Sequence, residues 1–134
     1  MYTATNMMMS STKTWVFLAT ASFCVCCDAN ISGDWSGACT LSQNGDPFSI
    51  QIDVSINEDV LKNIDGTSTL VCWDTVFNGY VNGFRNADVI VADAEALSGV
   101  NSIRVDLEGI ALEDEIHGTC SFFGESGVVH LVRY

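Results

Sequence analysis

The sequence predicts an all-β domain, and within that class an eight-stranded antiparallel up-and-down β-barrel. Short runs of alternating apolar and polar residues recur along the chain and are separated by turn residues, with no longer amphipathic segment between them. The chain has 134 residues, of which 48% are hydrophobic and 16% charged, so it is one domain and not a disordered chain. Eight such strands form a sandwich or a closed barrel, and closure removes the exposed edges.

The predicted strands are, in chain order, residues 34–41, 48–56, 67–73, 76–84, 88–94, 102–109, 116–123 and 127–133. The fourth is the least certain in type, because Asn78-Gly79 or Asn82-Gly83 also fits a two-residue hairpin turn. We favour the strand, since glycines at alternating positions suit the close backbone approach inside a narrow barrel.

Three further turn predictions set the ends of strands, and one of them also sets the register between the last two strands. Asp65-Gly66 marks a sharp bend, and residues 95–99 form a loop or a single helical turn. Gly124-Glu125 is predicted as a type II′ hairpin, which places Cys120 opposite Val129 on one apolar face.

The N-terminus is predicted to be a signal peptide over residues 1–29, which leaves residues 30–134 as the mature barrel domain. The apolar run WVFLATASFCVCC, at residues 15–27, is too short to cross a bilayer of about 30 Å but fits a signal sequence. Cleavage after Ala29 is favoured over cleavage after Ala21, and a lipid-anchored cysteine is a competing interpretation. We therefore expect a secreted or periplasmic protein without a stable membrane span.

The net charge limits the classes of partner that the chain can bind, and its cysteine content bears on the compartment in which it folds. Seventeen acidic and five basic residues give a formal net charge of −12, which disfavours nucleic acid and anionic membranes as partners. Cleavage after Ala29 leaves Cys39, Cys72 and Cys120, hence one disulfide and one thiol. The sequence does not fix the pairing; we prefer Cys39–Cys72.

Gly33-Asp34-Trp35 at the start of the first strand, together with Arg133 near the end of the last, resembles the calycin pattern of lipocalins and avidin-like barrels. The resemblance implies that Trp35 closes one end of the barrel and that Arg133 packs across it by cation–π attraction. A second lipocalin motif and a C-terminal helix are missing, and Gly37 stands where avidin-type barrels carry Asn. Biotin binding is therefore not expected.

An aromatic set is the candidate lining of a ligand cavity, and filling of the core is the alternative reading; its members are Trp73, Phe77, Tyr80, Phe84, Phe122 and Phe123. His117 and His130 are expected to face outward, away from any nucleophile, so we predict no catalytic residues. Acidic residues near positions 88–95 and 113–115 lack the spacing of a calcium loop. No metal site is predicted, because the mature chain has no C-x-x-C pair and the histidines lack a ligand spacing.

Two functions follow from these expectations. The first is an exported, non-enzymatic barrel that binds a small, partly apolar molecule and needs no cofactor. The second is a protein-interaction module, such as an inhibitor of a secreted protease. An isomerase-type or cyclase-type barrel enzyme is disfavoured because no acid–base pair stands out. Val128 and Val132 form an outward apolar strip that suits a contact between copies of the chain.

Overall fold

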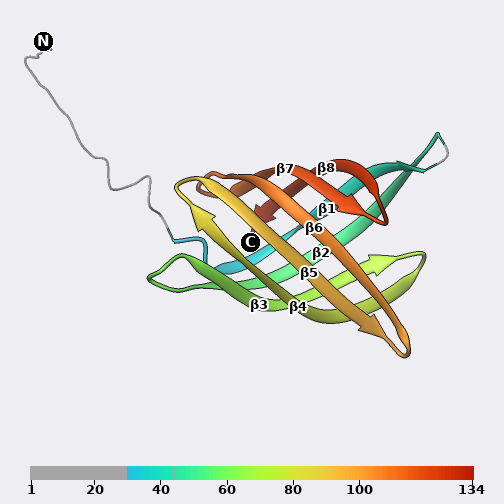
Figure 1. Ribbon diagram of the computed structural model, residues 1–134, viewed down its shortest axis with the longest axis horizontal. Coiled ribbons are helices and arrows are strands. Elements are labelled where there is room, and N and C mark those ends of the chain that lie inside the picture. Colours follow the sequence, from blue (N-terminus) through green and yellow to red (C-terminus); the bar gives the residue numbers. More distant parts are fainter. Residues whose placement is uncertain (1–29, 44) are drawn as a thin grey trace, which may run out of the picture. The chain divides into compact units, whose positions relative to one another are not determined.

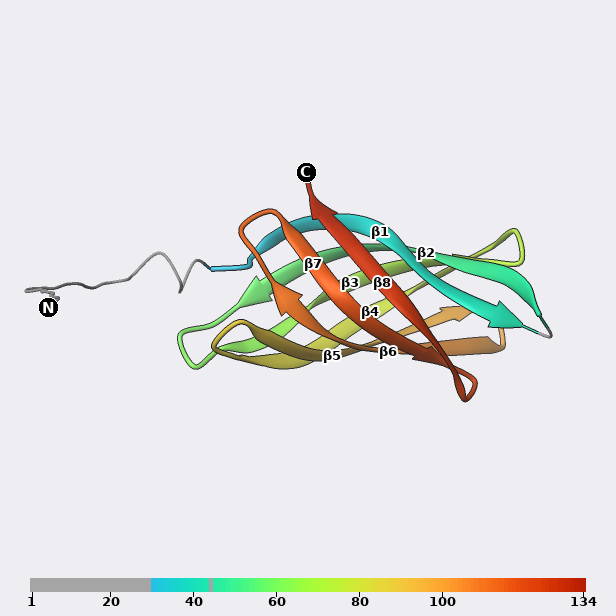
Figure 2. The same ribbon diagram turned by 90° about the horizontal axis from the view of Figure 1, so that it is seen from above.

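The computed structural model describes residues 30–43 and 45–134. Eight antiparallel strands follow one another around a closed barrel, and the last strand pairs with the first (Figures 1 and 2). The predicted fold class is confirmed, whereas the predicted signal peptide, residues 1–29, lies outside the described residues. The strands are β1 (Gly33–Gln43), β2 (Asp46–Glu58), β3 (Asn63–Cys72), β4 (Thr75–Asn86), β5 (Val89–Ser98), β6 (Asn101–Ala111), β7 (Glu115–Phe122) and β8 (Glu125–Arg133).

Alternation along each strand decides which side chains fill the barrel. In β2, Ile50, Ile52 and Val54 are buried, while Ser49 and Gln51 beside them are exposed. Successive strand residues point to opposite faces, so a period of two sends one apolar set inward. The buried apolar side chains of all eight strands form one core cluster inside the barrel.

The glycines of the fourth strand confirm that it is a strand and not a hairpin turn. A Cβ at Gly79 would lie 1.9 Å from the carbonyl oxygen of Glu95, and one at Gly83 would lie 2.2 Å from that of Val91. Only a residue without a side chain lets β4 approach β5 this closely.

Two predicted turns were wrong, because a strand continues through both places. Residues 95–98 are no loop or helical turn, because β5 continues to Ser98 and pairs with β6, and only Gly99 of the predicted loop lies in the turn. Asp65-Gly66 is no bend either but lies inside β3, where Gly66 pairs with Ile56. A Cβ at Gly66 would lie 1.8 Å from the Ser55 carbonyl oxygen. This glycine therefore marks a close approach between strands, not a change of direction.

The last hairpin turns one residue earlier than predicted. Phe123 and Gly124 are its two turn residues, with φ angles of 50° and 81°. Cys120 consequently pairs with Gly127 and not with Val129, which corrects the predicted register by two positions. A shift of two keeps every side chain on its predicted face, so the apolar residues of both strands still point inward.

The turns gather at two ends of the barrel. The hairpins β1–β2, β3–β4, β5–β6 and β7–β8 turn at one end, toward the right of Figure 1, which we call the mouth. The β2–β3, β4–β5 and β6–β7 connections lie at the other end, together with the start of β1 and the end of β8. We call this second end the closed end. No helix among the described residues is long and apolar enough to cross a membrane.

Candidate functional site at the barrel mouth

Trp35 fills the closed end, and Arg133 lies over it, as the resemblance to calycins implies. Trp35 is fully buried, and its indole N–H donates to the carbonyl oxygen of Ile31 over 2.9 Å. The Arg133 guanidinium lies 4.5 Å from the centre of the Trp35 ring. It also donates to the carbonyl oxygens of Ser32 and Glu113. Arg133 thereby ties the entering chain and the β6–β7 turn to the tryptophan, which gives it a structural role.

A buried ion pair beside this plug was missed by the sequence reasoning. The Arg85 guanidinium donates to both carboxylate oxygens of Glu58, over 2.7 and 3.1 Å, and both side chains are almost fully buried. Burial raises the pKa of Glu58, but the bonds from Arg85 and from the Ile31 amide outweigh it and hold the pKa below its usual value. The sequence pattern contains a sign of this pair. Glu58 follows Ile56 on the inward face of β2, and Arg85 follows Gly83 on the inward face of β4.

Side chains fill the barrel interior between the two ends. An enclosed cavity there, lined by apolar residues such as Val54, Val81 and Leu131, has a volume of about 20 Å³. One water needs about 10–15 Å³, whereas small-molecule pockets measure about 300–1,000 Å³. This cavity has room for about one water and is far smaller than the pocket that the predicted small ligand needs.

The six predicted aromatic residues do not share one cavity, which corrects that prediction. Phe77 and Phe122 are buried inside the barrel, but Tyr80 and Phe84 are 67% and 52% exposed on its outer wall. Phe77 and Tyr80 are three positions apart on one strand, so they necessarily point to opposite faces. Trp73 lies on neither face, because it is the first residue of the β3–β4 turn.

Four aromatic side chains meet at the mouth, and we call them the aromatic cluster: Phe48, Trp73, Phe122 and Phe123. Ring centres lie 5.5 Å apart for Phe48 and Trp73, 5.8 Å for Trp73 and Phe122, and 4.4 Å for Phe122 and Phe123. Phe122 is buried and closes the mouth, while Trp73 and Phe123 are 54% and 72% exposed. The predicted aromatic set contains Trp73, Phe122 and Phe123 but not Phe48.

Trp73 and Phe123 hold equivalent positions on two hairpin turns. Each is the first of two turn residues, with φ angles of 53° and 50°, and each is followed by a second residue of positive φ. Asn and Gly favour this conformation, whereas a bulky residue there is an outlier. The β5–β6 turn at the same end uses Gly99, with a φ of 63°. Two turns therefore carry large aromatic side chains at positions where local backbone energy disfavours them.

Surface grooves and acidic residues surround the aromatic cluster. Trp73 borders a groove of about 430 Å³ shared with Phe48, and Phe123 borders one of about 600 Å³ on the outer wall of β4 to β6. Asp46, Asp74 and Glu125 are exposed in or beside the mouth turns. Of the basic residues of the described part, Arg104 lines the groove beside Phe123 on the outer wall, and the others lie at the closed end; these are Lys62, Arg85 and Arg133.

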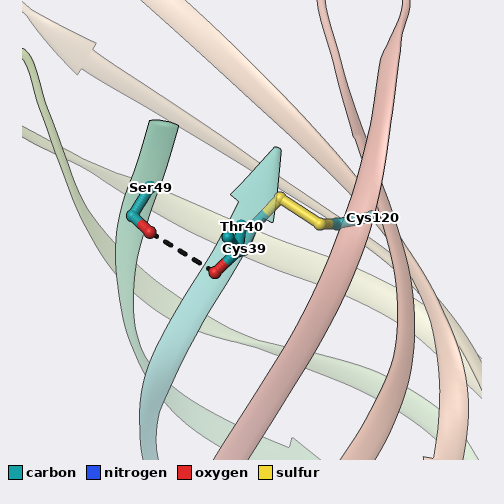
Figure 3. Close-up of a disulfide and its surroundings, with 4 residues drawn as sticks. All are labelled: Cys39, Thr40, Ser49 and Cys120. Carbon is teal, nitrogen blue, oxygen red and sulfur yellow. Dashed lines mark hydrogen bonds between the residues drawn. A yellow bond between two sulfur atoms is a disulfide. The ribbon is translucent and has the colours of Figure 1, made fainter. Parts of the chain in front are cut away.

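A disulfide below the aromatic cluster joins Cys39 on β1 to Cys120 on β7 (Figure 3). The preferred Cys39–Cys72 pairing was therefore wrong, and Cys72 is a free, buried thiol whose pKa burial raises. β8 lies between β1 and β7, so the bridge passes across its inner face. Outside the barrel, Thr40 turns toward Ser49 on β2 (Figure 3). The bridge indicates an oxidising environment.

The remaining acidic and histidine residues lie on the outer wall. Arg104 lies within 4.0 Å of carboxylate oxygens of Asp93, Glu95 and Asp106, so these acidic residues form an ion-pair network with it. His117 and His130 are exposed, as predicted. Val128 and Val132 are exposed too, and a contact between copies through them stays a prediction.

Comparison with protein-family models, with characterised proteins and with solved structures returned no match. The likeness to calycins rests on the eight-stranded barrel and on the packing of Trp35 against Arg133.

Proposed function

We propose that the mature chain is an exported, non-enzymatic, calycin-like barrel that binds a protein segment at its mouth. The segment it fits carries an apolar side chain flanked by Lys or Arg. The observation that carries this proposal is the exposure of Trp73 and Phe123 at turn positions that disfavour bulky residues. Backbone strain of this kind persists where the surrounding structure enforces it, and it gathers at binding sites.

The filled interior favours a protein partner over the small molecule that the sequence also suggested. A carrier barrel needs a cavity, whereas a protein partner needs exposed anchors and grooves that border them. Trp is among the residues that contribute most at protein interfaces, and Trp73 stands beside the buried Phe122, which fixes its place.

Charge selects the kind of segment. The aromatic cluster is bordered by Asp46, Asp74 and Glu125, and the chain as a whole carries a net charge of −12. Basic groups on the partner gain from this field, and a Lys or Arg above Trp73 gains cation–π attraction as well.

The absence of a reactive thiol among the described residues supports a non-enzymatic role, since Cys39 and Cys120 are bonded and Cys72 is buried.

Substitution of the two turn aromatics tests the proposal. Trp73→Asn and Phe123→Asn remove the rings but suit a positive φ, so the barrel is expected to stay folded. The probe is a synthetic peptide with Phe between lysines, titrated calorimetrically into the mature protein. Loss of an interface anchor costs about 2 kcal/mol, so each variant is expected to bind about 30-fold more weakly.

Phe84→Thr is the matched control, because Phe84 is as exposed as Trp73 but lies on the outer wall of β4. It is expected to bind the peptide like the wild type. Equal affinity of the wild type and both Asn variants would overturn the proposal, and so would tighter binding of a peptide with Phe between glutamates.

A further inference from the structure

Two histidines and a glutamate meet on the outer wall of β7 and β8. The Nε2 atoms of His117 and His130 each lie 2.9 Å from the same Glu115 carboxylate oxygen. The imidazole rings are stacked, with centres 4.2 Å apart and planes 15° apart. All three side chains are about half exposed.

The strand register brings the three side chains together. His117 and His130 are direct partners across β7 and β8, and Glu115 lies two positions before His117 on the same face of β7. Cross-strand partners hold their Cβ atoms about 4.5–5.5 Å apart, so the two rings stack without distortion. The expectation that these histidines lack a ligand spacing rested on their separation along the sequence. It was wrong for the folded barrel, because pairing of β7 with β8 brings them together.

We propose that Glu115, His117 and His130 bind a divalent transition-metal ion of the zinc type. One ligand atom from each side chain lies within 4.8 Å of the other two. Imidazole nitrogen and carboxylate oxygen are zinc ligands at about 2.0–2.2 Å, which places neighbouring ligand atoms of a tetrahedral site about 3.3 Å apart. To admit the ion, the two 2.9 Å contacts open by a few tenths of an ångström and the two stacked rings turn so that one nitrogen of each faces it.

The surroundings favour a cation. Both imidazole Nε2 atoms already face one oxygen of the Glu115 carboxylate, and binding of the ion displaces the protons held between them. The next positions across the sheet are apolar, because Ile110 pairs with His117 and Ala38 pairs with His130. Neither neighbour supplies a competing positive charge.

The geometry leaves the rest of the coordination sphere to water. Three protein ligands with an open position are typical of exchangeable zinc sites, whereas structural sites use four protein ligands. The site lies on the outer wall, away from the aromatic cluster, so it does not depend on the proposed function. Since all three ligands belong to one hairpin, the ion joins β7 to β8 in the folded barrel and stabilises it.

Calorimetric titration of the mature protein with zinc chloride tests the site. One ion per chain is expected to bind, and His117→Ala or Glu115→Gln is expected to weaken binding at least tenfold, since even ligand-supporting residues change affinity by about 10- to 100-fold. Glu125→Gln is the control, because it removes the same charge from β8 and leaves the three ligands in place. Equal zinc affinity of the wild type and His117→Ala would overturn the proposal.

A measurement on the wild type alone covers the case in which a variant does not fold. The chain has two histidines, so both imidazole signals can be followed by NMR during the zinc titration. Both are expected to shift together, to saturate at one equivalent, and to return on addition of a chelator. Absence of saturable shifts, or shifts confined to acidic residues elsewhere, would contradict the site.

Discussion

Removal of the Cys39–Cys120 bridge is expected to destabilise the barrel strongly. The two cysteines are 81 positions apart, so the bridge closes most of the mature chain into one loop. In the chain-entropy description a loop of this length restricts the unfolded state by about 4.5 kcal/mol at 25 °C. Natural small domains have a stability of about 5–15 kcal/mol, so this loss leaves the reduced barrel marginally folded.

Urea unfolding with and without reductant measures the effect. The wild type in reductant and Cys39→Ala/Cys120→Ala without reductant are expected to show similarly lowered free energies of unfolding. Cys72→Ala is the control and keeps the full response to reductant, because Cys72 is a free thiol. A wild type whose stability changes by less than about 1 kcal/mol on reduction would refute the reasoning, and a Cys72→Ala variant insensitive to reductant would refute the pairing.

Two further changes test the closed end and the mouth turns. Glu58→Gln leaves Arg85 buried without its partner charge and is expected to cost about 3–5 kcal/mol at pH 7, measured by urea unfolding. Because the pKa of Glu58 is lowered in the folded state, the wild type keeps this stabilisation above the ordinary glutamate pKa of 4.5 and loses it as the pH falls further. The free energies of unfolding of the wild type and the variant are therefore expected to converge in acid. A difference that stays constant with pH would contradict the ion pair. Phe123→Asn relieves a strained turn and removes a ring that is mostly exposed. The free energy of unfolding of this variant is therefore expected to equal that of the wild type or to exceed it by up to about 1 kcal/mol. A clear loss of stability would show that this ring is needed for folding.

The sequence was sufficient for the fold because burial in a barrel follows a period of two. The run from Phe48 to Ile56 alternates without a break, and the structure buries the set that contains Ile50, Ile52 and Val54. A pattern of this kind fixes which face a residue occupies whatever its partner is. The resemblance that paired Trp35 with Arg133 added one contact between the two ends of the chain.

The parts that were missed depend on register and on turn conformation. The predicted turn at Gly124-Glu125 would set His117 opposite Val132, whereas the observed turn sets it opposite His130. An aromatic residue at a positive φ breaks the usual turn preferences, so the sequence did not place Phe123 in the turn. The metal-type cluster was missed with it, because it depends on the observed register. Glu58 lies beyond residue 56, where the predicted strand ends, although the alternation of β2 continues through it to the closed end.

NMR titration of the tryptophan indole N–H signals tests the central claim most directly. Among the described residues, Trp73 is half exposed at the mouth and Trp35 is buried at the closed end, so one signal reports on the site and the other is an internal control. Unlabelled peptide with Phe between lysines is added to ¹⁵N-labelled mature protein. Binding at the mouth predicts a saturable shift of the Trp73 signal while the Trp35 signal stays unchanged. A shift of Trp35 with Trp73 unmoved would contradict it.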